Sequence, residues 1–375
     1  MHASRDGLPK IYVKLSKEMT SIFINLKPEY AICVEEDGTL IVEVLKGLYG
    51  LIESVHTWYN HLTSFLKLQD FIVWEHDKCV MKKGEVTIAI YVDDLLITGP
   101  QEDVNRICVE LEGQFGNCKR KTGSEFNFLG INSKVLNGRA SLHIDLSKIV
   151  DKIEGRADTP APNNLLAVSD QAEELNDINR QKFHSMVAKL LYIAKRSRPD
   201  IMFVVNFLCT RVLKPTVEDF LKLVGVLKYL RATMDYELIL EEKEHGEDVV
   251  MEVYFDASYG VHQDAKSHSG MVVTLGSGTI LAVSTKQKCV SKSSTEAELI
   301  AVTDLLPNAM ELRNITEEIT GKKVRLVFYQ DNMATIRMIK NGTVGARSKH
   351  IKIRFAWLKE KLEAGDFELE YKPTG

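Results

Sequence analysis

Two adjacent aspartates, Asp93 and Asp94, interrupt an otherwise apolar stretch and strongly limit how this region can fold. Val86–Tyr91 precedes them and Leu95–Thr98 follows, so the pattern predicts two strands joined by a tight acidic turn. Neighbouring carboxylates repel each other, which usually requires a cation or an exposed position. Carboxylate oxygens suit Mg²⁺, whose ligand shell a nucleotide phosphate can complete. An ordinary Asp-Asp β-turn is the competing interpretation.

Two polar breaks divide the chain of 375 residues. Asp158–Asn164 holds two prolines, and Glu241–Asp248 is a run of charged residues with one glycine. We therefore expect three domains, at 1–158, 159–247 and 248–375. The first mixes helix and strand patterns, the second is mostly helical, and the third begins with strands and then alternates strands with helices.

Local signals predict several elements inside these domains. Asn137-Gly138 is a strong two-residue hairpin signal. Thr216 is the expected N-cap of a helix over 217–232, because its hydroxyl can accept a hydrogen bond from the first turn. A long helix is expected over 294–320.

The third domain contains carboxylates on three separate elements. Asp256 ends a predicted strand, Glu298 lies near the start of the long helix, and Asp331 follows another strand. Such carboxylates can converge on a pair of cations, which suits phosphodiester hydrolysis. Each residue also has a structural interpretation: Asp256 could close a turn, and Asp331 with Asn332 could cap a helix. Glu296 competes with Glu298, because capping boxes fit both.

The overall charge argues weakly against nucleic-acid binding, since the net charge is -4 and the sequence pI is about 6.2. Gln181–Arg231 nevertheless holds ten Lys and Arg against three acidic residues, and could track phosphates or form a solvated helix face. Six cysteines without a CxxC pair predict neither zinc nor disulfides. The polar N-terminus and the short apolar runs predict an intracellular protein with no membrane partner.

The acidic turn has the motif of a known family. Tyr91-Val-Asp-Asp94 matches the tetrapeptide that carries two of the three palm carboxylates in reverse transcriptases. The surrounding motifs resemble copia-type LTR retrotransposon polyproteins: Lys46-Gly-Leu-Tyr-Gly-Leu51, Trp58-Tyr59, Leu190-Leu-Tyr-Ile193 and Arg198-Pro-Asp-Ile201. The resemblance implies an α+β and α/β multidomain fold. Its expected parts are a partial reverse-transcriptase palm, a helical thumb or connection, and an RNase H-like mixed sheet with flanking helices.

The same resemblance assigns roles to the carboxylates. It implies that Asp93 and Asp94 are catalytic metal ligands of the palm. It implies the same role for Asp256, Glu298 and Asp331 in ribonuclease H, and leaves Glu296 as the capping residue. The implied cofactor is Mg²⁺, with Mn²⁺ as the alternative. The implied partner is an RNA–DNA hybrid or a primer–template, in the cytoplasm within a virus-like particle or in the nucleus.

The departures from the family pattern lower the expected activity. Met1-His2-Ala3 resembles the stretch that follows the first palm carboxylate, and the fourth ribonuclease H carboxylate would come after Gly375. We therefore expect polymerase activity to be lost and hydrolysis of hybrid RNA to be weak or lost. The alternatives are a non-catalytic nucleic-acid-binding remnant and a decayed genomic relic.

Overall fold

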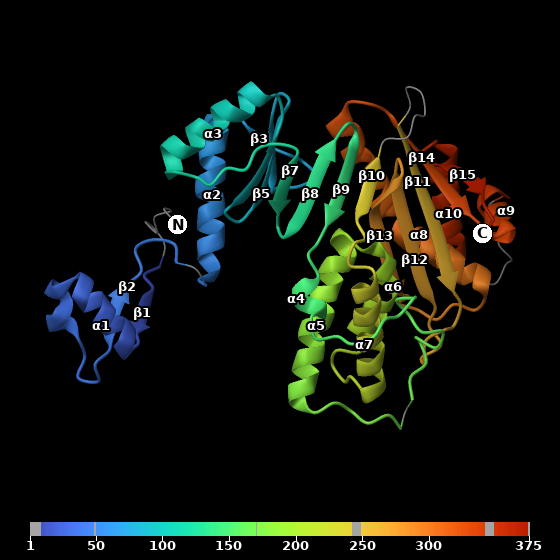
Figure 1. Ribbon diagram of the computed structural model, residues 1–375. Helices are drawn as coiled ribbons and strands as arrows, with labels where there is room; N and C mark the ends of the chain where they lie inside the picture. Colours follow the sequence, from blue (N-terminus) through green and yellow to red (C-terminus); the bar gives the residue numbers. More distant parts are fainter. Residues whose placement is uncertain (1–8, 49, 170, 242–248, 342–348, 374–375) are drawn as a thin grey trace. The chain divides into compact units, whose positions relative to one another are not determined.

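The computed structural model divides into two compact units, Met1–Arg120 and Lys121–Gly375 (Figure 1). It describes residues 9–48, 50–169, 171–241, 249–341 and 349–373. Within those residues, no helix has both the length and the apolar character needed to cross a bilayer. The three-domain division expected from the polar breaks stays a prediction.

The first unit contains two antiparallel sheets with helices. Its elements are β1 (Tyr12–Leu15), α1 (Lys17–Leu26), the 3-10 helix η1 (Pro28–Cys33), β2 (Leu40–Glu43), α2 (Ile52–Leu68), β3 (Ile72–Val73), β4 (Val80–Lys83), β5 (Val86–Tyr91), β6 (Asp94–Thr98) and α3 (Gln101–Phe115). β1 pairs with β2, and the larger sheet has the order β3-β4-β5-β6. Leu66 of α2 and Leu111 of α3 pack with Ile88 of β5 in one buried core. The hairpin predicted around the two aspartates is thus β5-β6.

The second unit contains two sheets and a helical region. Its elements are β7 (Glu125–Phe128), β8 (Ile131–Leu136), β9 (Arg139–His143), α4 (Ser147–Val150), α5 (Asp177–Arg196), η2 (Pro199–Ile201), α6 (Met202–Cys209), α7 (Val217–Ala232), β10 (Leu238–Glu241), β11 (Val249–Ser258), β12 (His268–Leu275), β13 (Gly278–Lys286), α8 (Ser294–Thr320), β14 (Val324–Gln330), α9 (Met333–Asn341), α10 (Lys349–Glu363) and β15 (Glu368–Tyr371).

The local signals in this unit produce the hairpin, the helix cap and the long helix that the sequence predicts. Asn137 and Gly138 have φ angles of 52° and 73°, and they join β8 to β9 in a tight hairpin. Thr216 caps α7, and the Asp219 carboxylate accepts a hydrogen bond from the Thr216 backbone N–H in a capping box. α8 covers the predicted 294–320.

Strand β10 was not predicted. It pairs with β9 and completes a sheet of order β10-β9-β8-β7, so the chain returns after α7 to a hairpin formed almost a hundred residues earlier. β10 also runs against the start of β13, where Ser277 N–H donates to Glu241 O at 2.9 Å. A Cβ placed on Gly278 would lie 2.2 Å from Ile239 O, so only glycine allows this close approach.

The helical region comprises α5, η2, α6 and α7. A buried arginine from the Arg198-Pro-Asp-Ile201 motif connects its helices through hydrogen bonds. Arg198 is 3% exposed and donates to Asp200 Oδ2, to Thr233 O and to Thr233 Oγ1, at 2.7, 2.8 and 2.7 Å. The Tyr229 hydroxyl also donates to Asp200 Oδ2, at 2.8 Å. These contacts join the end of α5 to the C-terminal turn of α7.

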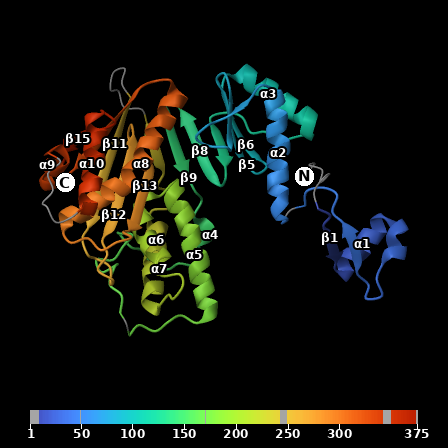
Figure 2. The same cartoon turned by 180° about the vertical axis from the view of Figure 1, so that it is seen from behind.

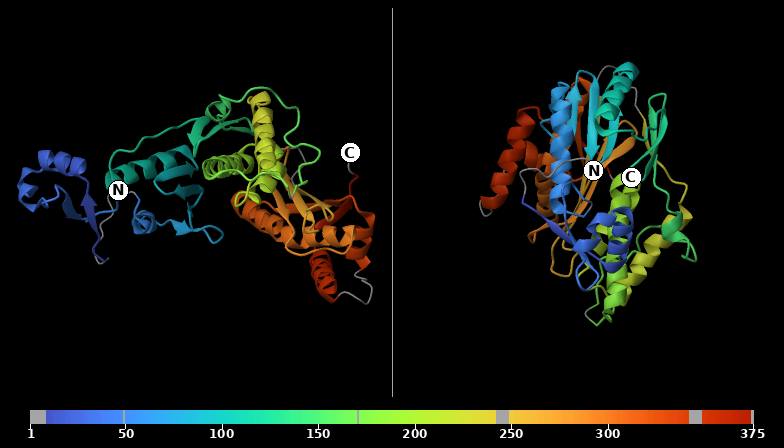
Figure 3. Two further views of the ribbon diagram at one scale, coloured as in Figure 1. Left: turned by 90° about the horizontal axis from the view of Figure 1, so that it is seen from below. Right: turned by 90° about the vertical axis from the view of Figure 1, so that its left-hand side faces the viewer.

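The five-stranded sheet has the order β13-β12-β11-β14-β15. β11, β12 and β13 pair antiparallel, whereas β14 and β15 continue the sheet in parallel to β11. Helix α8 covers one face, where Leu299 and Val302 pack with Val253 and Phe328 (Figure 2). The helical region, which contains α6, packs against β13 on the other side of the sheet (Figure 3). The predicted multidomain α+β and α/β fold class, including this mixed sheet with flanking helices, is confirmed.

Candidate active site

The first predicted site is the turn between β5 and β6. Tyr91 pairs with Asp94, so Val92 and Asp93 form a two-residue loop. Both aspartates are exposed. Val92 has a φ of 56°, a conformation that β-branched residues rarely adopt. Its carbonyl accepts a hydrogen bond of 2.6 Å from the indole nitrogen of Trp58 on α2.

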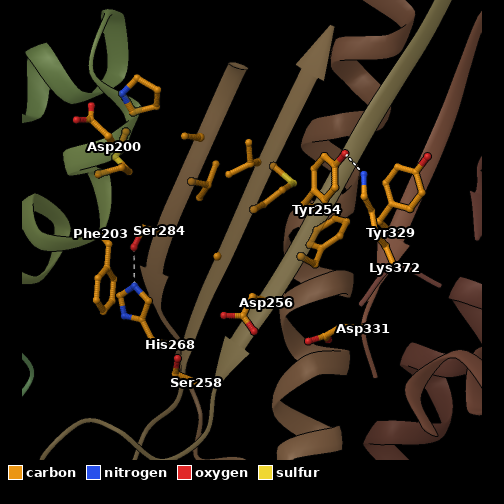
Figure 4. A pocket seen from close by; sticks show the side chains of 18 of the residues that line it. Asp200, Phe203, Tyr254, Asp256, Ser258, His268, Ser284, Tyr329, Asp331 and Lys372 are labelled. Carbon is orange, nitrogen blue, oxygen red and sulfur yellow. Dashed lines mark hydrogen bonds between the residues drawn. The ribbon is translucent and has the colours of Figure 1, made fainter. Parts of the chain in front are cut away.

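The second predicted site lies on the mixed sheet, at the ends of β11 and β14. Tyr254 and Tyr329 are register partners on these parallel strands, and Asp256 and Asp331 follow each of them by two residues. Because side chains alternate along a strand, Asp256 follows Tyr254 on the face opposite α8. Asp331 lies just beyond the end of β14 and lines the same pocket as Asp256. Figure 4 shows the two aspartates side by side at these strand ends. Asn332 caps α9, since its side chain accepts from Ala334 and Thr335 N–H, and Asp331 lines the site.

Glu298 and Glu296 divide the two roles that the sequence left open. Ser293 is the N-cap of α8 and accepts from Glu296 N–H, while Glu296 Oε2 accepts from Lys292 N–H at 2.9 Å. Glu296 therefore serves the start of the helix, as predicted. Glu298 lies one half-turn further on, and its Oε1 accepts a hydrogen bond of 3.2 Å from Ala257 N–H on β11.

The Glu298 carboxylate is electrostatically coupled to both aspartates. Only 6% of Glu298 is exposed. Burial, and then the charges of Asp256 and Asp331, raise the pKa of Glu298 to about 7, although hydrogen bonds from Gln330 and Ala257 oppose the rise. Like charges raise a carboxyl pKa only when they are close enough to interact. The three carboxylates therefore share one electrostatic environment.

A pocket of about 610 Å³ opens beside Asp256 and Asp331. On one side, Tyr254 and Tyr329 stack with centroids 5.1 Å apart, and Lys372 Nζ lies 4.7 and 4.5 Å from the two ring centroids. Lys372 also donates to the Tyr254 hydroxyl at 2.8 Å (Figure 4). Sequence reasoning missed these three residues. The spacing of two between each tyrosine and its aspartate was the available signal.

The opposite wall of the pocket contains a buried imidazole. His268 Nε2 lies 2.7 Å from Ser284 Oγ, and its Nδ1 lies 3.0 Å from His262 Nε2. Burial, followed by the neighbouring His262, lowers the pKa of His268 to about 4. The ring of Phe203 from α6 meets the His268 ring edge-on at 5.2 Å. This polar chain was also not predicted.

The donor set fits a hard divalent ion in type, because carboxylate oxygens are the ligands that Mg²⁺ and Mn²⁺ prefer. The coupling between Glu298 and the two aspartates is what bound cations would relieve. Across the described part of the chain, however, no three His, Cys, Asp or Glu side chains are already grouped closely enough to hold a metal ion. Asp256, Glu298 and Asp331 would therefore have to close around an ion.

Comparisons with known proteins bear on both sites. Residues 12–160 match the family described as reverse transcriptase (RNA-dependent DNA polymerase). The chain is 28% identical to the retrovirus-related Pol polyprotein from transposon TNT 1-94 of Nicotiana tabacum, over 86% of this chain and 25% of that polyprotein. It is 29% identical to the Pol polyprotein from transposon RE1 of Arabidopsis thaliana, over 89% of this chain and 23% of that polyprotein. The chain thus spans about a quarter of the length of these relatives.

A solved structure supports the fold. The foamy viral protease-reverse transcriptase, determined in complex with an RNA/DNA hybrid, matches 91% of this chain and 40% of its own length, with a TM-score of 0.51. Its sequence is 14% identical, so the likeness concerns the fold alone. The predicted resemblance is therefore confirmed in sequence over most of the chain, and residues 12–160 match the reverse-transcriptase family.

Proposed function

We propose that this chain acts on RNA–DNA hybrids or primer–template duplexes. The proposal rests on its relatedness, over most of its length, to the Pol polyproteins of copia-type retrotransposons. Residues 248–375 form the ribonuclease H domain and 1–158 the palm of an RNA-directed DNA polymerase. Residues 159–247 form the thumb and connection.

The observation that carries the nuclease proposal is the electrostatic coupling of Glu298 to Asp256 and Asp331 beside an open pocket. These three carboxylates would hold Mg²⁺ or Mn²⁺. When bound, such ions activate a water molecule and stabilise the leaving oxygen of a phosphodiester. Glu298 must lose its proton to become a ligand, and its pKa of about 7 makes that loss dependent on pH near neutrality.

We expect the hydrolysis to be weak. Three carboxylates can hold one ion well and a second ion less tightly, whereas the reaction uses two. Mn²⁺ binds oxygen sites more tightly than Mg²⁺ and should support more cleavage. The hydrolysis should depend on Asp256, so Asp256→Asn should abolish whatever cleavage the parent shows.

The acidic turn supports a polymerase palm. Asp93 and Asp94 are exposed at the end of a hairpin, where they can bind a divalent ion together with a nucleotide phosphate. Phosphoryl transfer with two ions draws carboxylates from separate elements. Among the described residues no third acidic or other metal-binding side chain joins this pair. We expect the chain alone not to polymerise DNA, and template-dependent incorporation abolished by Asp93→Asn would contradict that.

A face of α5 offers a surface for the nucleic-acid backbone. Lys182, Lys189 and Arg196 are exposed and recur at intervals of seven, which places them on one side of the helix. Arg196 lies 5.8 Å from the ring of Tyr192, which is also exposed. Positive charges along a helix can follow phosphates without reading bases. This face lies in the same unit as Asp256 and would supply binding for the nuclease reaction.

The proposal is tested by cleavage of an end-labelled RNA–DNA hybrid by the purified chain, with Mg²⁺ and then Mn²⁺, beside Asp331→Asn. Cleavage by the parent and not by the variant is the expected result. Equal cleavage by both would reject the site. Binding of the hybrid without cleavage in either metal would instead support the non-catalytic binding protein.

A further inference from the structure

The turn that presents Asp93 and Asp94 has an unfavourable residue at its first loop position. Val92 has a φ of 56°, whereas Asp93 is not among the residues with positive φ. Positive φ at the first loop position alone is the pattern of a type II′ hairpin turn, which normally requires glycine there. A valine does not hold this conformation by itself, so contacts outside the turn must support it.

The support comes from Trp58, on α2 of the same unit. Its indole N–H donates to the Val92 carbonyl at 2.6 Å across 34 residues of sequence. That carbonyl belongs to the central peptide of the turn, between Val92 and Asp93. Type I′ and type II′ turns differ by a flip of this peptide. A hydrogen bond to its oxygen therefore selects one of the two orientations and, with it, the direction of the Asp93 backbone.

The indole is itself held by aromatic packing. The rings of Trp58 and Phe115 meet edge to face with centroids 5.2 Å apart. Phe115, the last residue of α3, also packs against His61 and Phe65 of α2, each at 5.4 Å. The N–H donor thus comes from a packed junction of two helices, whose ring contacts restrict the position of the indole.

We propose that Trp58 is a positioning residue: its hydrogen bond to the Val92 carbonyl holds the strained turn in the orientation that lets Asp93 and Asp94 bind a divalent ion together. The proposal rests on the proposed role of the aspartate pair as metal ligands. It assigns to Trp58 a function beyond packing. Phenylalanine would fill much of the same space but could not donate the hydrogen bond, so Trp58→Phe separates the two roles.

The test is Mn²⁺ binding by the full chain, followed by electron paramagnetic resonance, with Asp256→Asn and Asp331→Asn present throughout to remove the other site. Trp58→Phe should weaken Mn²⁺ binding about 5-fold, the value of one hydrogen bond. In a Val92→Gly background the same change should cost less than about 2-fold, because glycine adopts positive φ unaided. Trp74→Phe, on a tryptophan outside this hydrogen bond, is the control for loss of an indole and should leave binding unchanged.

The outcomes separate the two ideas. If Asp94→Asn leaves Mn²⁺ binding unchanged, the aspartate pair is not a metal site and the proposed function of the turn fails. If Asp94→Asn abolishes binding but Trp58→Phe has no effect, the positioning role is wrong. Trp58→Phe could also cause the same loss of Mn²⁺ binding with Val92 as with glycine at position 92. That result would reject the positioning role, since it would indicate general disruption of the fold, which does not depend on the turn residue.

Discussion

Replacement of Glu298 with glutamine should make the second unit more stable above pH 7. The carboxylate is 6% exposed, and burial together with Asp256 and Asp331 raises its pKa from 4.5 to about 7. One pKa unit corresponds to about 1.4 kcal/mol. Ionised Glu298 therefore lowers the free energy of unfolding by about 3 kcal/mol relative to the protonated form.

The sign follows from the direction of the pKa change. A raised pKa means that the folded protein holds this proton more tightly than the unfolded chain does. The stability is complete below pH 4.5 and is lost as the pH rises through about 7. Glutamine keeps an oxygen for Ala257 N–H but cannot ionise. Glu298→Gln should thus gain about 3 kcal/mol at pH 8 and almost nothing at pH 4.

The assay is hydrogen exchange of β11 and α8 amides across a urea series with a chelator, comparing parent and variant at the same pH. Added Mn²⁺ should stabilise the parent and leave Glu298→Gln unchanged, because only the parent keeps all three carboxylates. Glu296→Gln is the matched control two residues away. It weakens the bond to Lys292 N–H and should lose about 1 kcal/mol at pH 8. A Glu298→Gln gain that is absent, or equal at both pH values, would refute the reasoning.

Two further predictions concern the framework. Arg198→Met should destabilise the helical region by about 3 kcal/mol, because it removes the donor to the buried Thr233 carbonyl and one partner of the ion pair with Asp200, and exchange of α7 amides would report it. Arg156→Met removes only an exposed hydrogen bond of 3.4 Å to Ala232 O and should change the exchange much less. Gly278→Ala should lower the urea midpoint of the second unit and increase exchange in β10, since its Cβ would meet Ile239 O at 2.2 Å. Unchanged exchange in β10 would show that the strand can shift away.

Elements with a strong local signal were predicted well from the sequence. The hairpin at Asn137-Gly138 forms because these residues adopt positive φ at little cost. The cap at Thr216 forms because its hydroxyl and the Asp219 carboxylate satisfy the first helical N–H groups. Each depends on contacts within a few residues, which a sequence shows directly.

Strand β10 was missed for the opposite reason. Leu238–Glu241 is only four residues long, and it pairs with β9 across most of the helical region. Its identity as a strand depends on that distant partner and on the space left at Gly278. Short strands with remote partners have little periodicity of their own.

The features of the candidate site divide in the same way, into residues predicted from the sequence and a pocket that only the structure reveals. Motifs and element order predicted Asp256, Glu298 and Asp331 as metal ligands, and this assignment stays a prediction. The capping contact of Glu296 agrees with the choice of Glu298 over Glu296. The pocket beside them was not predicted, because Lys372 reaches Tyr254 from 118 residues away.

The sequence by itself determined the kinship and the local elements, and it supplied the prediction of the acidic site residues, since all three depend on residue type and short spacing. The tertiary structure decided the burial, the neighbouring charges and the hydrogen bonds of those residues. Burial of Glu298 between strand ends sets its pKa, and the approach of Trp58 to Val92 supports the strained turn. Both effects depend on groups brought together by folding, and pKa values and turn conformations respond to distance and solvent exposure.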